Sequence, residues 1–481
     1  MVARDLHEYV RLLEDSKKLD RVKVEVDPEL ELAEVLRRCV KQRPGRAVLF
    51  EKVKGYRIPV LGNAFSSDEL VAFSLGEKDL PSLGKKLSSL FSFEPPTGLV
   101  DALRSIPKLR GLVGISPKKV SKAPVKEIVE KDPSFDSIPI TKTWPGDAGK
   151  FITFPLVVTR DPDTGVTNIG VYRVQIFDSK SATIHWQRHR SSAIAYRKLD
   201  RQGQRMDVAL VVGADPATIF TGVAPVPEAI DEYLFAGFLQ GTGIEVVKCE
   251  TSDLVVPARA EIVLEGHVDP GEQRLEGPFG DHTGYYTPQE PYPVFHLDAI
   301  TRREEPIYLT TVVGKPVLED TFLANAAQAM FTEPLKLLFP EITDLYMPPE
   351  GVFTNLAFVS IKKQYPAHAK KIMMGLWGMP QLMFLKMIVV LDDDVNVRDV
   401  SEVLWAVSTR IDPQRDIVII PDTVTDTLDH ASKMPNLGSK MGVDATRKWP
   451  EEGYTRSWPD VVSPDSKTKQ LVDSKWAQYF S

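Results

Sequence analysis

The chain has 481 residues, of which 43% are hydrophobic and 26% charged, a composition typical of a folded soluble protein rather than a disordered or fibrous one. At roughly 150 residues per domain, this length predicts about three domains. The net charge of −7 provides no basic surface for phosphate backbones, so we expect no nucleic-acid partner.

The sequence contains no uninterrupted apolar run of about 18 residues, and its opening MVARDLHEYVRLLEDSKKLD has the pattern of an amphipathic helix rather than a signal peptide. Cys39 and Cys249 are the only cysteines, too few for a CxxC pair, a zinc cage or a disulfide framework. We therefore expect no transmembrane segment and a reducing, cytoplasmic setting. The low asparagine count hints at a thermophilic source, because asparagine is heat-labile.

The first stretch has the alternation of an α/β region. Asp27 and Pro28 predict the N-cap and first position of a helix that ends near Cys39. From 107 to 144 Pro, Lys and Ser accumulate, which is typical of a connector, and we place a domain boundary there. Short apolar strands are predicted at 47–50 and 59–62.

From about residue 151 to 313 the pattern changes to short strands, with one clear helix predicted at 228–239. Several short strands at close spacing around one helix predict a small barrel or a sandwich. The predicted strands cover residues 153–160, 168–177, 183–187, 208–212, 255–268, 293–300 and 307–313.

After Pro316 helices and strands alternate again, which favours a mostly parallel sheet. Beyond Asp422 the chain is polar and rich in Trp, Pro and Lys, and we expect its last segment to close as an arm on a neighbouring subunit. Helices are predicted at 321–338, 367–376 and 401–410, and strands at 356–361, 387–391 and 416–420.

Several common motifs are absent. The sequence has no GxGxxG, GxxxxGK[ST] or GxSxG, which argues against a P-loop enzyme and an α/β hydrolase. The run that begins at Asp392 starts like an EF-hand loop, but Val397 replaces the required glycine and Val403 the bidentate glutamate. We interpret the run as an acidic strand end that feeds the next helix.

The segment EGPFGDHTG is more informative. Its glycines and proline predict a compact turn, so that the carboxylates of Glu276 and Asp281 could converge on one pocket. Close carboxylates push their pKa values apart, which would leave one protonated as a general acid while an Arg holds the other ionised. The alternative is a polar turn with two solvated acids.

A second cluster contains Asn168, Arg173, His185 and His189. In one extended strand Asn168 and Arg173 would point to opposite faces, so a site here needs a twist or bulge. His185 and His189 could bind zinc, although their spacing signals a metal chiefly on a helix. Asn168, His189 and a carboxylate would instead suit Mn or Mg bridging a phosphate.

Glu232 lies between apolar residues on the one helix of the strand-rich region. A carboxylate flanked by Ile230, Leu234 and Phe235 is expected to have a charge partner. That partner is either an arginine or a metal ion.

Several longer blocks resemble the UbiD family of reversible decarboxylases. They follow one another from about residue 168 to 450, and the N-terminal region is compatible too, so the likeness covers nearly the whole chain. So many blocks in one order are more specific than any short motif. The blocks are GVYR, WQRHR, GADPATIFTGVAPVPEAIDEYLFAG, EGPFGDHTGYY, KKQYPAHAKKIMMGLWG, DDDVNVRD and GSKMGVDATRKWP.

The resemblance implies prenylated FMN as the cofactor, supplied by a separate flavin prenyltransferase and bound through its phosphate with Mn²⁺ and a K⁺ ion. Matched residue by residue, it implies Asn168, His189 and Glu232 as Mn²⁺ ligands, and Lys386 as a further phosphate contact. The residues implied to line the flavin and its phosphate are Val171, Tyr172, Arg173, His185, Trp186, Gln187, Arg188, Arg190 and Ser191.

The resemblance also implies an α/β (α+β) fold and an assembly into a homodimer or homohexamer. Its catalytic network would be Glu276, Arg173 and Asp281, with Asp281 protonating the carbon that loses carbon dioxide. The implied domains are an N-terminal α/β domain (1–115), a flavin-binding split β-barrel (116–315), a C-terminal α/β domain (316–450) and a tail or oligomerisation arm (451–481).

The resemblance leaves the substrate open. One candidate is trans-anhydromevalonate 5-phosphate, in an archaeal isoprenoid route. The other is 4-hydroxy-3-polyprenylbenzoate or a menaquinone precursor, in prenylquinone synthesis. Arg188 could contact a substrate phosphate, the cofactor phosphate or solvent. Two other classes compete with the decarboxylase. One is a flavin-binding or scaffold subunit without turnover, and the other is a Mn/Zn hydrolase that uses His185, His189 and Glu232 without flavin.

Overall fold

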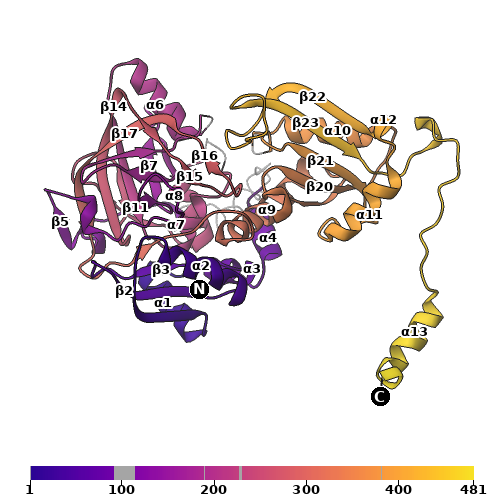
Figure 1. Cartoon of the computed structure of the whole chain (residues 1–481), viewed down its shortest axis with the longest axis horizontal. Coiled ribbons are helices and arrows are strands. Elements are labelled where there is room, and N and C mark those ends of the chain that lie inside the picture. Colours follow the sequence, from indigo (N-terminus) through magenta and orange to yellow (C-terminus); the bar gives the residue numbers. More distant parts are fainter. Residues whose placement is uncertain (1, 92–113, 189, 227–229, 381, 481) are drawn as a thin grey trace, which may run out of the picture.

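The computed structural model describes residues 2–91, 114–188, 190–226, 230–380 and 382–480. These residues form two lobes, with the N-terminal and strand-rich regions in one lobe and the C-terminal domain in the other (Figure 1). Helix α9 (Glu319–Leu338) lies between the lobes and packs on both α4 (Leu80–Phe91) and β19 (Ile342–Tyr346). Within the described residues, no helix is long and apolar enough to cross a membrane.

The N-terminal region contains a mixed sheet in the order β1-β2-β3-β18. Its last strand, β18 (Tyr308–Leu309), comes from far along the chain and pairs parallel with β3, so the N-terminal sheet and the barrel are built together. The other strands are β1 (Leu19–Val26), β2 (Ala47–Val53) and β3 (Val60–Gly62), and the helices are α1 (Leu6–Asp15), α2 (Glu31–Gln42), α3 (Asp68–Ser74) and α4.

The predicted start of the second helix was wrong. Asp27 does not cap it, because its carboxylate instead accepts a hydrogen bond from the backbone of Glu29. The following residues pair with the connector, since the Leu30 N–H donates to the Lys142 carbonyl. This pairing holds Leu30 at a φ of 67°, so that α2 begins only at Glu31.

The strand-rich region forms one antiparallel sheet that curls into a half-barrel, in the order β6-β9-β10-β17-β14-β11-β7-β8 with β5 on β17. Strand β8 ends this order and the next strand, β9, lies at the other side with only β6 beyond it, so the chain crosses the open side of the barrel at Tyr172 and Arg173. The strands are β5 (Ile128–Glu130), β6 (Phe151–Ile152), β7 (Leu156–Arg160), β8 (Thr167–Val171), β9 (Val174–Ile176), β10 (Ser181–Ile184), β11 (Met206–Val212), β14 (Ile262–Glu276) and β17 (Glu290–Arg302).

This region contains more helix than the single one predicted. Helix α6 (Ser191–Arg201) buries Ser192, Ala193, Ala195 and Tyr196, and α7 (Pro216–Thr221) begins at the N-cap Asp215. The predicted helix at 228–239 is α8 (Glu232–Gln240), with Asp231 as its N-cap. Smaller elements are β4 (Lys118–Lys119), β12 (Glu245–Lys248), β13 (Val255–Pro257), β15 (Phe279–Gly280), β16 (Tyr286–Thr287) and the 3-10 turns Pro124–Lys126 and Phe135–Ser137.

The C-terminal domain has a five-stranded sheet in the order β19-β20-β21-β23-β22, covered by α10 (His368–Trp377) on one face and α11 (Val400–Arg410) on the other. The inner pairs are parallel and the outer pairs antiparallel, so the predicted mostly parallel sheet is correct only for its centre. The strands besides β19 are β20 (Leu356–Ile361), β21 (Met387–Asp392), β22 (Ile417–Val424) and the unpredicted β23 (Leu437–Asp444), with α12 (Pro413–Asp416) and 3-10 turns at Pro349–Gly351 and Pro450–Glu452.

The chain then leaves the C-terminal domain as an extended arm that ends in α13 (Ser466–Lys475) and a 3-10 turn, Trp476–Phe480, far from either lobe (Figure 1). None of the residues in these two elements is buried. The arm nevertheless carries large apolar side chains, with Val462 98% and Phe480 76% exposed.

Candidate active site

Arg173 lies where the chain crosses the open side of the half-barrel, and it is the centre of a buried polar cluster. Its Nε donates to Glu276 Oε1 at 2.8 Å and its Nη2 to Glu276 Oε2 at 3.1 Å, while Nη1 pairs with Asp281. Nη2 also donates to Thr287 Oγ1 at 3.0 Å, and the guanidinium lies over the Phe279 ring. One cation therefore joins two carboxylates that are separated in the sequence.

The two carboxylates meet because of the connection between β14 and β17. Glu276 is the last residue of β14, and a hairpin of β15 and β16 then folds back and presents Asp281 at its turn. The backbone of this hairpin lies close to Trp144, since a Cβ added at Gly280 would come within 2.3 Å of the Trp144 ring. The glycine at this position thus allows the turn to reach Arg173.

The predicted separation of the two pKa values is not found, because Arg173 stabilises both anions. Burial alone raises the pKa of Glu276, but Arg173 and His185 outweigh it and lower this pKa to about 2. Burial likewise opposes ionisation of Asp281, yet Arg173 and His282 hold its pKa below the ordinary value. Both carboxylates are therefore ionised at neutral pH.

His185 belongs to the same cluster. Its Nδ1 lies 3.1 Å from Glu276 Oε2, its Nε2 lies 3.4 Å from the Tyr292 hydroxyl, and the two rings pack at 4.3 Å. Burial and the charge of Arg173 lower the pKa of His185, so its ring is neutral. Since both ring nitrogens have partners, the arrangement argues against His185 as a zinc ligand.

Asn168 and Glu232 form a second pair near the same crossing. The Asn168 amide donates to Glu232 Oε1 at 3.1 Å, and the backbone N–H of Ile169 donates to the other carboxylate oxygen. Ser192 Oγ in turn donates to Asn168 Oδ1 at 2.7 Å. The strand β8 and the first turn of α8 therefore bring together two oxygen donors that the sequence separates.

Glu232 has no ion pair within the described part of the chain, although it is buried. Burial raises its pKa to about 8, and Arg190 opposes this shift only through its distant charge. A buried carboxylate without a cation fits a hard metal ion such as Mn²⁺ or Mg²⁺. The Asn168 oxygen accepts from Ser192, and it is the amide nitrogen that faces Glu232. The third predicted ligand, His189, lies outside the described residues.

The stretch between β10 and α6 provides the surroundings expected for a phosphate-bearing ligand. Trp186 is buried against Tyr196, yet its Nε1 has no hydrogen-bond partner among the residues described. The N-terminus of α6 begins with Arg190 and Ser191, and the Arg190 side chain does not cap it. Free N–H groups at a helix N-terminus favour an anion, so this stretch fits a phosphate.

The other predicted ligand-binding residues divide between the two lobes. Val171 and Tyr172 end β8 and enter the crossing, with the Tyr172 ring packed over Gly170. Gln187 and Arg190 line a small cavity with Phe384, Asp426 and Thr427 of the C-terminal domain. Arg188 is exposed, and Lys386 pairs with Asp429 within the C-terminal domain at 2.8 Å.

The sequence reasoning did not identify several members of this site. His282 lies beside Asp281, and its ring stacks on Phe353 of the C-terminal domain at 5.4 Å. Asp320 comes from the first turn of α9, and Ser192 from the helix that was missed. His282 stood in the block already singled out and could have been noticed there, whereas no local pattern connects Asp320 to this site.

Comparison with known proteins identifies the family. The three domains of 3-octaprenyl-4-hydroxybenzoate carboxy-lyase match in order: its N-terminal domain at residues 10–89, its Rift-related domain at 118–316 and its C-terminal domain at 321–445. An uncharacterized protein of Archaeoglobus fulgidus is 51% identical over 99% of this chain and 98% of its own.

Two solved enzymes share the whole fold. The UbiD-class enzyme HmfF from Pelotomaculum thermopropionicum in complex with FMN is 30% identical, covers 98% of this chain and 99% of its own, and superposes with a TM-score of 0.79. An evolved dimeric form of HmfF is solved with prenylated FMN.

Vanillic acid decarboxylase of Sedimentibacter hydroxybenzoicus is 29% identical over both full chains, with TM-scores of 0.86 for its closed form and 0.79 for its open form. The present lobe arrangement is thus more similar to the closed form, in agreement with the contact between His282 and Phe353. The chain belongs to the UbiD family of carboxy-lyases.

Proposed function

We propose that this protein binds prenylated FMN and Mn²⁺ and decarboxylates an aromatic or α,β-unsaturated carboxylic acid. The observation that carries the proposal is the buried cluster in which Arg173 joins Glu276 and Asp281, beside the uncompensated Glu232. The FMN and prenylated FMN complexes of HmfF support the same cofactor here. A complete cluster of this kind favours an active enzyme over a scaffold subunit.

The residues present fit the cofactor. Asn168, Glu232 and His189 would hold Mn²⁺, and this ion together with K⁺ would compensate the charge of the cofactor phosphate. The phosphate would lie at the N-terminus of α6, near Arg190 and Ser191. A flavin prenyltransferase would supply the cofactor, which provides an electron sink at the carbon that loses carbon dioxide.

The chain's own residues would perform the proton chemistry. Arg173 and Glu276 hold the Asp281 carboxyl in place and set its proton affinity, because the guanidinium contacts both anions. Asp281 would deliver a proton to the carbon from which carbon dioxide departs. The contact of His282 with Phe353 places the C-terminal domain against the turn that carries Asp281, which would limit the access of water.

The two substrates proposed first are trans-anhydromevalonate 5-phosphate and 4-hydroxy-3-polyprenylbenzoate. The first would place the enzyme in isoprenoid synthesis and the second in prenylquinone synthesis. Arg188 is exposed near the phosphate stretch and would favour the phosphorylated acid if it contacts the substrate. Vanillic acid, the substrate named for the Sedimentibacter relative, completes the set.

The test is release of carbon dioxide from these three acids by protein co-expressed with a flavin prenyltransferase. We expect the co-expressed protein to decarboxylate one of the three acids. Samples prepared without the prenyltransferase should decarboxylate none of them. Carbon dioxide release without the flavin would contradict the proposed cofactor. A correctly loaded protein that turns over no acid in the set would support the scaffold subunit.

We further propose that the arm docks on a second copy of this chain, as a homodimer or homohexamer requires. Trp476, Tyr479 and Phe480 are exposed at its end, and apolar side chains of this size are rarely left in water on a projecting element. Truncation after Gly453 should reduce the mass measured by light scattering while the thermal midpoint of the monomer fold changes little. An unchanged mass would contradict this docking.

A further inference from the structure

The proposed decarboxylation needs one proton in each turnover, since R–COO⁻ + H⁺ gives R–H + CO₂. Asp281 is the group placed to deliver that proton, but Arg173 pairs with its carboxylate and holds it ionised. An ionised carboxylate has no proton to give. A neighbouring group must therefore protonate Asp281 before it can act.

His282 is placed to do so. Its Nδ1 lies 2.8 Å from Asp281 Oδ1, and its backbone N–H donates to the same oxygen at 2.7 Å. Arg173 contacts the other oxygen, Oδ2, so the two cations occupy opposite sides of one carboxylate. Because the ring is stacked on Phe353, its Nδ1 is held toward Asp281.

Asp320, in the first turn of α9, acts on His282 through its charge and has an unused acceptor. Its Oδ1 accepts a hydrogen bond from the backbone of Thr321 at 3.0 Å. Its Oδ2 is shielded from solvent and accepts no hydrogen bond from the described residues. A buried carboxylate oxygen without a partner is costly unless it carries a proton or faces a cation.

The charged groups around His282 come from three elements: Asp281 from its own turn, Asp320 from α9 and Asp426 from the segment after β22. Burial disfavours the charged ring, but these three carboxylates outweigh it and raise the pKa of His282 to about 9. Burial raises the pKa of Asp320 to about 7, although the charge of His282 opposes this shift. The His282 ring therefore holds a proton at neutral pH.

We propose that His282 and Asp320 form a proton reservoir that protonates Asp281 in each turnover, which rests on the decarboxylation proposed above. The Nδ1 proton of the imidazolium moves to the Asp281 carboxylate, leaving a neutral ring and a neutral carboxylic acid. Asp281 then gives this proton to the substrate carbon and becomes a carboxylate again. His282, whose side chain is 21% exposed, then takes up a proton from solvent while the charge of Asp320 favours the protonated ring, so one proton enters for each carbon dioxide released.

The first test needs neither cofactor nor substrate. Nitrogen resonances of protein labelled with ¹⁵N-histidine are followed from pH 5 to 10 in the wild type and in His282→Asn, whose amide keeps a donor near the Nδ1 position. We expect one imidazole to titrate near pH 9 and to be missing from His282→Asn but present in the matched barrel variant His296→Asn. A His282 ring that titrates at or below its ordinary pKa would overturn the proposal.

Asp320→Asn keeps His282 and provides a second route should His282→Asn fail to fold. Losing one nearby negative charge should lower the pKa of His282 by about one unit. In the loaded enzyme, the alkaline limb of the kcat profile should move down by the same amount, whereas a purely structural role would lower kcat equally at every pH. An unmoved limb would overturn the reservoir while the proposed function stands.

The two proposals fail in different ways. If the loaded wild type releases carbon dioxide from neither vanillic acid nor the two biosynthetic acids, the proposed function fails, and the titration still decides whether His282 holds a proton. With an active wild type, we expect His282→Asn to lose about 100-fold in kcat, as removal of a proton-transfer group does. Full activity in that variant would overturn the reservoir.

Discussion

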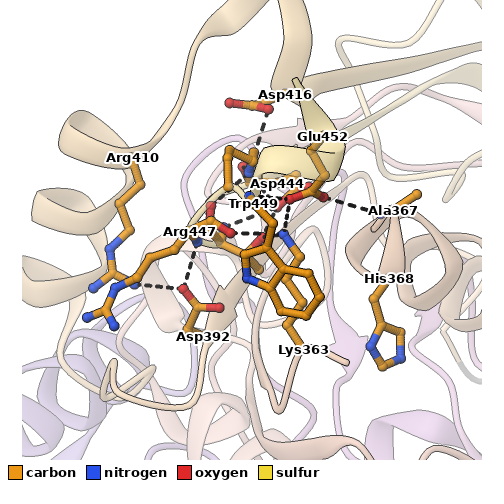
Figure 2. Close-up of polar contacts among 12 residues, drawn as sticks. Lys363, Ala367, His368, Asp392, Arg410, Asp416, Asp444, Arg447, Trp449 and Glu452 are labelled. Carbon is orange, nitrogen blue, oxygen red and sulfur yellow. Dashed lines mark hydrogen bonds and ion pairs between the residues drawn. The ribbon is translucent and has the colours of Figure 1, made fainter. Parts of the chain in front are cut away.

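Two clusters of buried charges lie in the two lobes, and they differ in how well their members are paired. The barrel cluster is centred on Arg173, and the second, which we call the C-terminal cluster, joins β20, β21, β23 and α11 (Figure 2). The C-terminal cluster consists of Lys363, Asp392, Asp394, Arg410, Asp416, Asp444, Arg447, Lys448 and Glu452.

In the C-terminal cluster the two lysines are fully paired. Lys363 Nζ donates to Thr446 Oγ1, the Arg447 carbonyl and Glu452, while Lys448 Nζ donates to the carbonyls of Asp444 and Thr446 and lies 2.9 Å from Asp444 Oδ1. These contacts hold the segment that follows β23 against the sheet (Figure 2). The C-terminal cluster therefore stabilises the fold of its domain.

The acidic run that begins at Asp392, which resembles the start of a calcium loop, belongs to the C-terminal cluster. Arg410 pairs with Asp392 at 3.2 Å and with Asp394 at 3.1 Å, and Arg447 also contacts Asp394. Since these carboxylates already have guanidinium partners, the arrangement agrees with the interpretation that they bind no calcium.

Cations lower the pKa values of Glu276 and Asp281 in the barrel, as they do for most carboxylates of the C-terminal cluster, and Glu232 beside the barrel cluster differs from both. In the C-terminal cluster, burial is outweighed by cations, which hold the pKa values of Asp394, Asp416 and Glu452 below their ordinary values; Asp392, whose pKa burial raises, is the exception. In the barrel, burial instead raises the pKa of Glu232 to about 8. A buried ion pair alone therefore does not identify an active site. Buried ionisable groups without a charge partner beside such a pair do identify one.

The largest contrast should appear between Asp281→Asn and Asp394→Asn. We expect Asp281→Asn to lower the rate of carbon dioxide release by about 10³-fold, because the amide cannot deliver a proton, while the flavin stays bound. Asp394→Asn should lower the thermal midpoint and leave the rate unchanged. Full activity in Asp281→Asn would remove Asp281 from the mechanism.

Removing the central cation of each cluster should destabilise both lobes. Arg173→Met removes the guanidinium from Glu276 and Asp281, and Lys363→Met removes the ammonium group from Glu452, which costs about 3–5 kcal/mol of unfolding free energy. Denaturant unfolding of both variants measures this loss. If either variant is as stable as the wild type, the corresponding cluster is not the buried network described here.

Glu232→Gln should release the metal. Replacing a charged oxygen ligand by an amide should lower the manganese content of purified protein at least about tenfold, as measured by elemental analysis. The matched control is Glu265→Gln, which alters another buried glutamate of the same barrel that is bonded to Thr251. Equal manganese in both variants would show that Glu232 is not a ligand.

The smallest effect concerns acid stability. The pKa of Glu452 is lowered in the folded state, so its pairing stabilises the fold fully above the unfolded value near 4.5 and is lost as the pH falls toward the folded value. The stability difference between the wild type and Glu452→Gln should therefore be constant above about pH 5.5 and shrink below pH 4.5. A difference that grows on acidification would reverse the sign of this linkage.

Local sequence patterns predicted what local physics decides. The turn-forming glycines between Glu276 and Asp281 indicated that the two carboxylates could converge, but they left a turn with two solvated acids open. The need for an arginine followed from their proximity, but that it is Arg173 came only from the family resemblance. No periodicity reveals that β8 ends one sheet in which β9 lies near the opposite edge.

The elements that were missed are those whose partners lie far away in the sequence. β23 was taken for a polar tail because its Lys440 is buried by tertiary contacts, donating to the carbonyls of Met383 and Leu385. Asp320 joins the site only because α9 runs between the lobes. α6, in contrast, has a buried stripe at helical spacing from Ser192 to Tyr196 that could have been recognised.

The most direct test of the central claim is mass spectrometry of the small molecules released from protein co-expressed with a flavin prenyltransferase, with metal analysis of the same sample. The account predicts prenylated FMN together with manganese in the wild type, and neither one retained in Glu232→Gln. A folded wild-type protein that releases neither prenylated FMN nor manganese would contradict it.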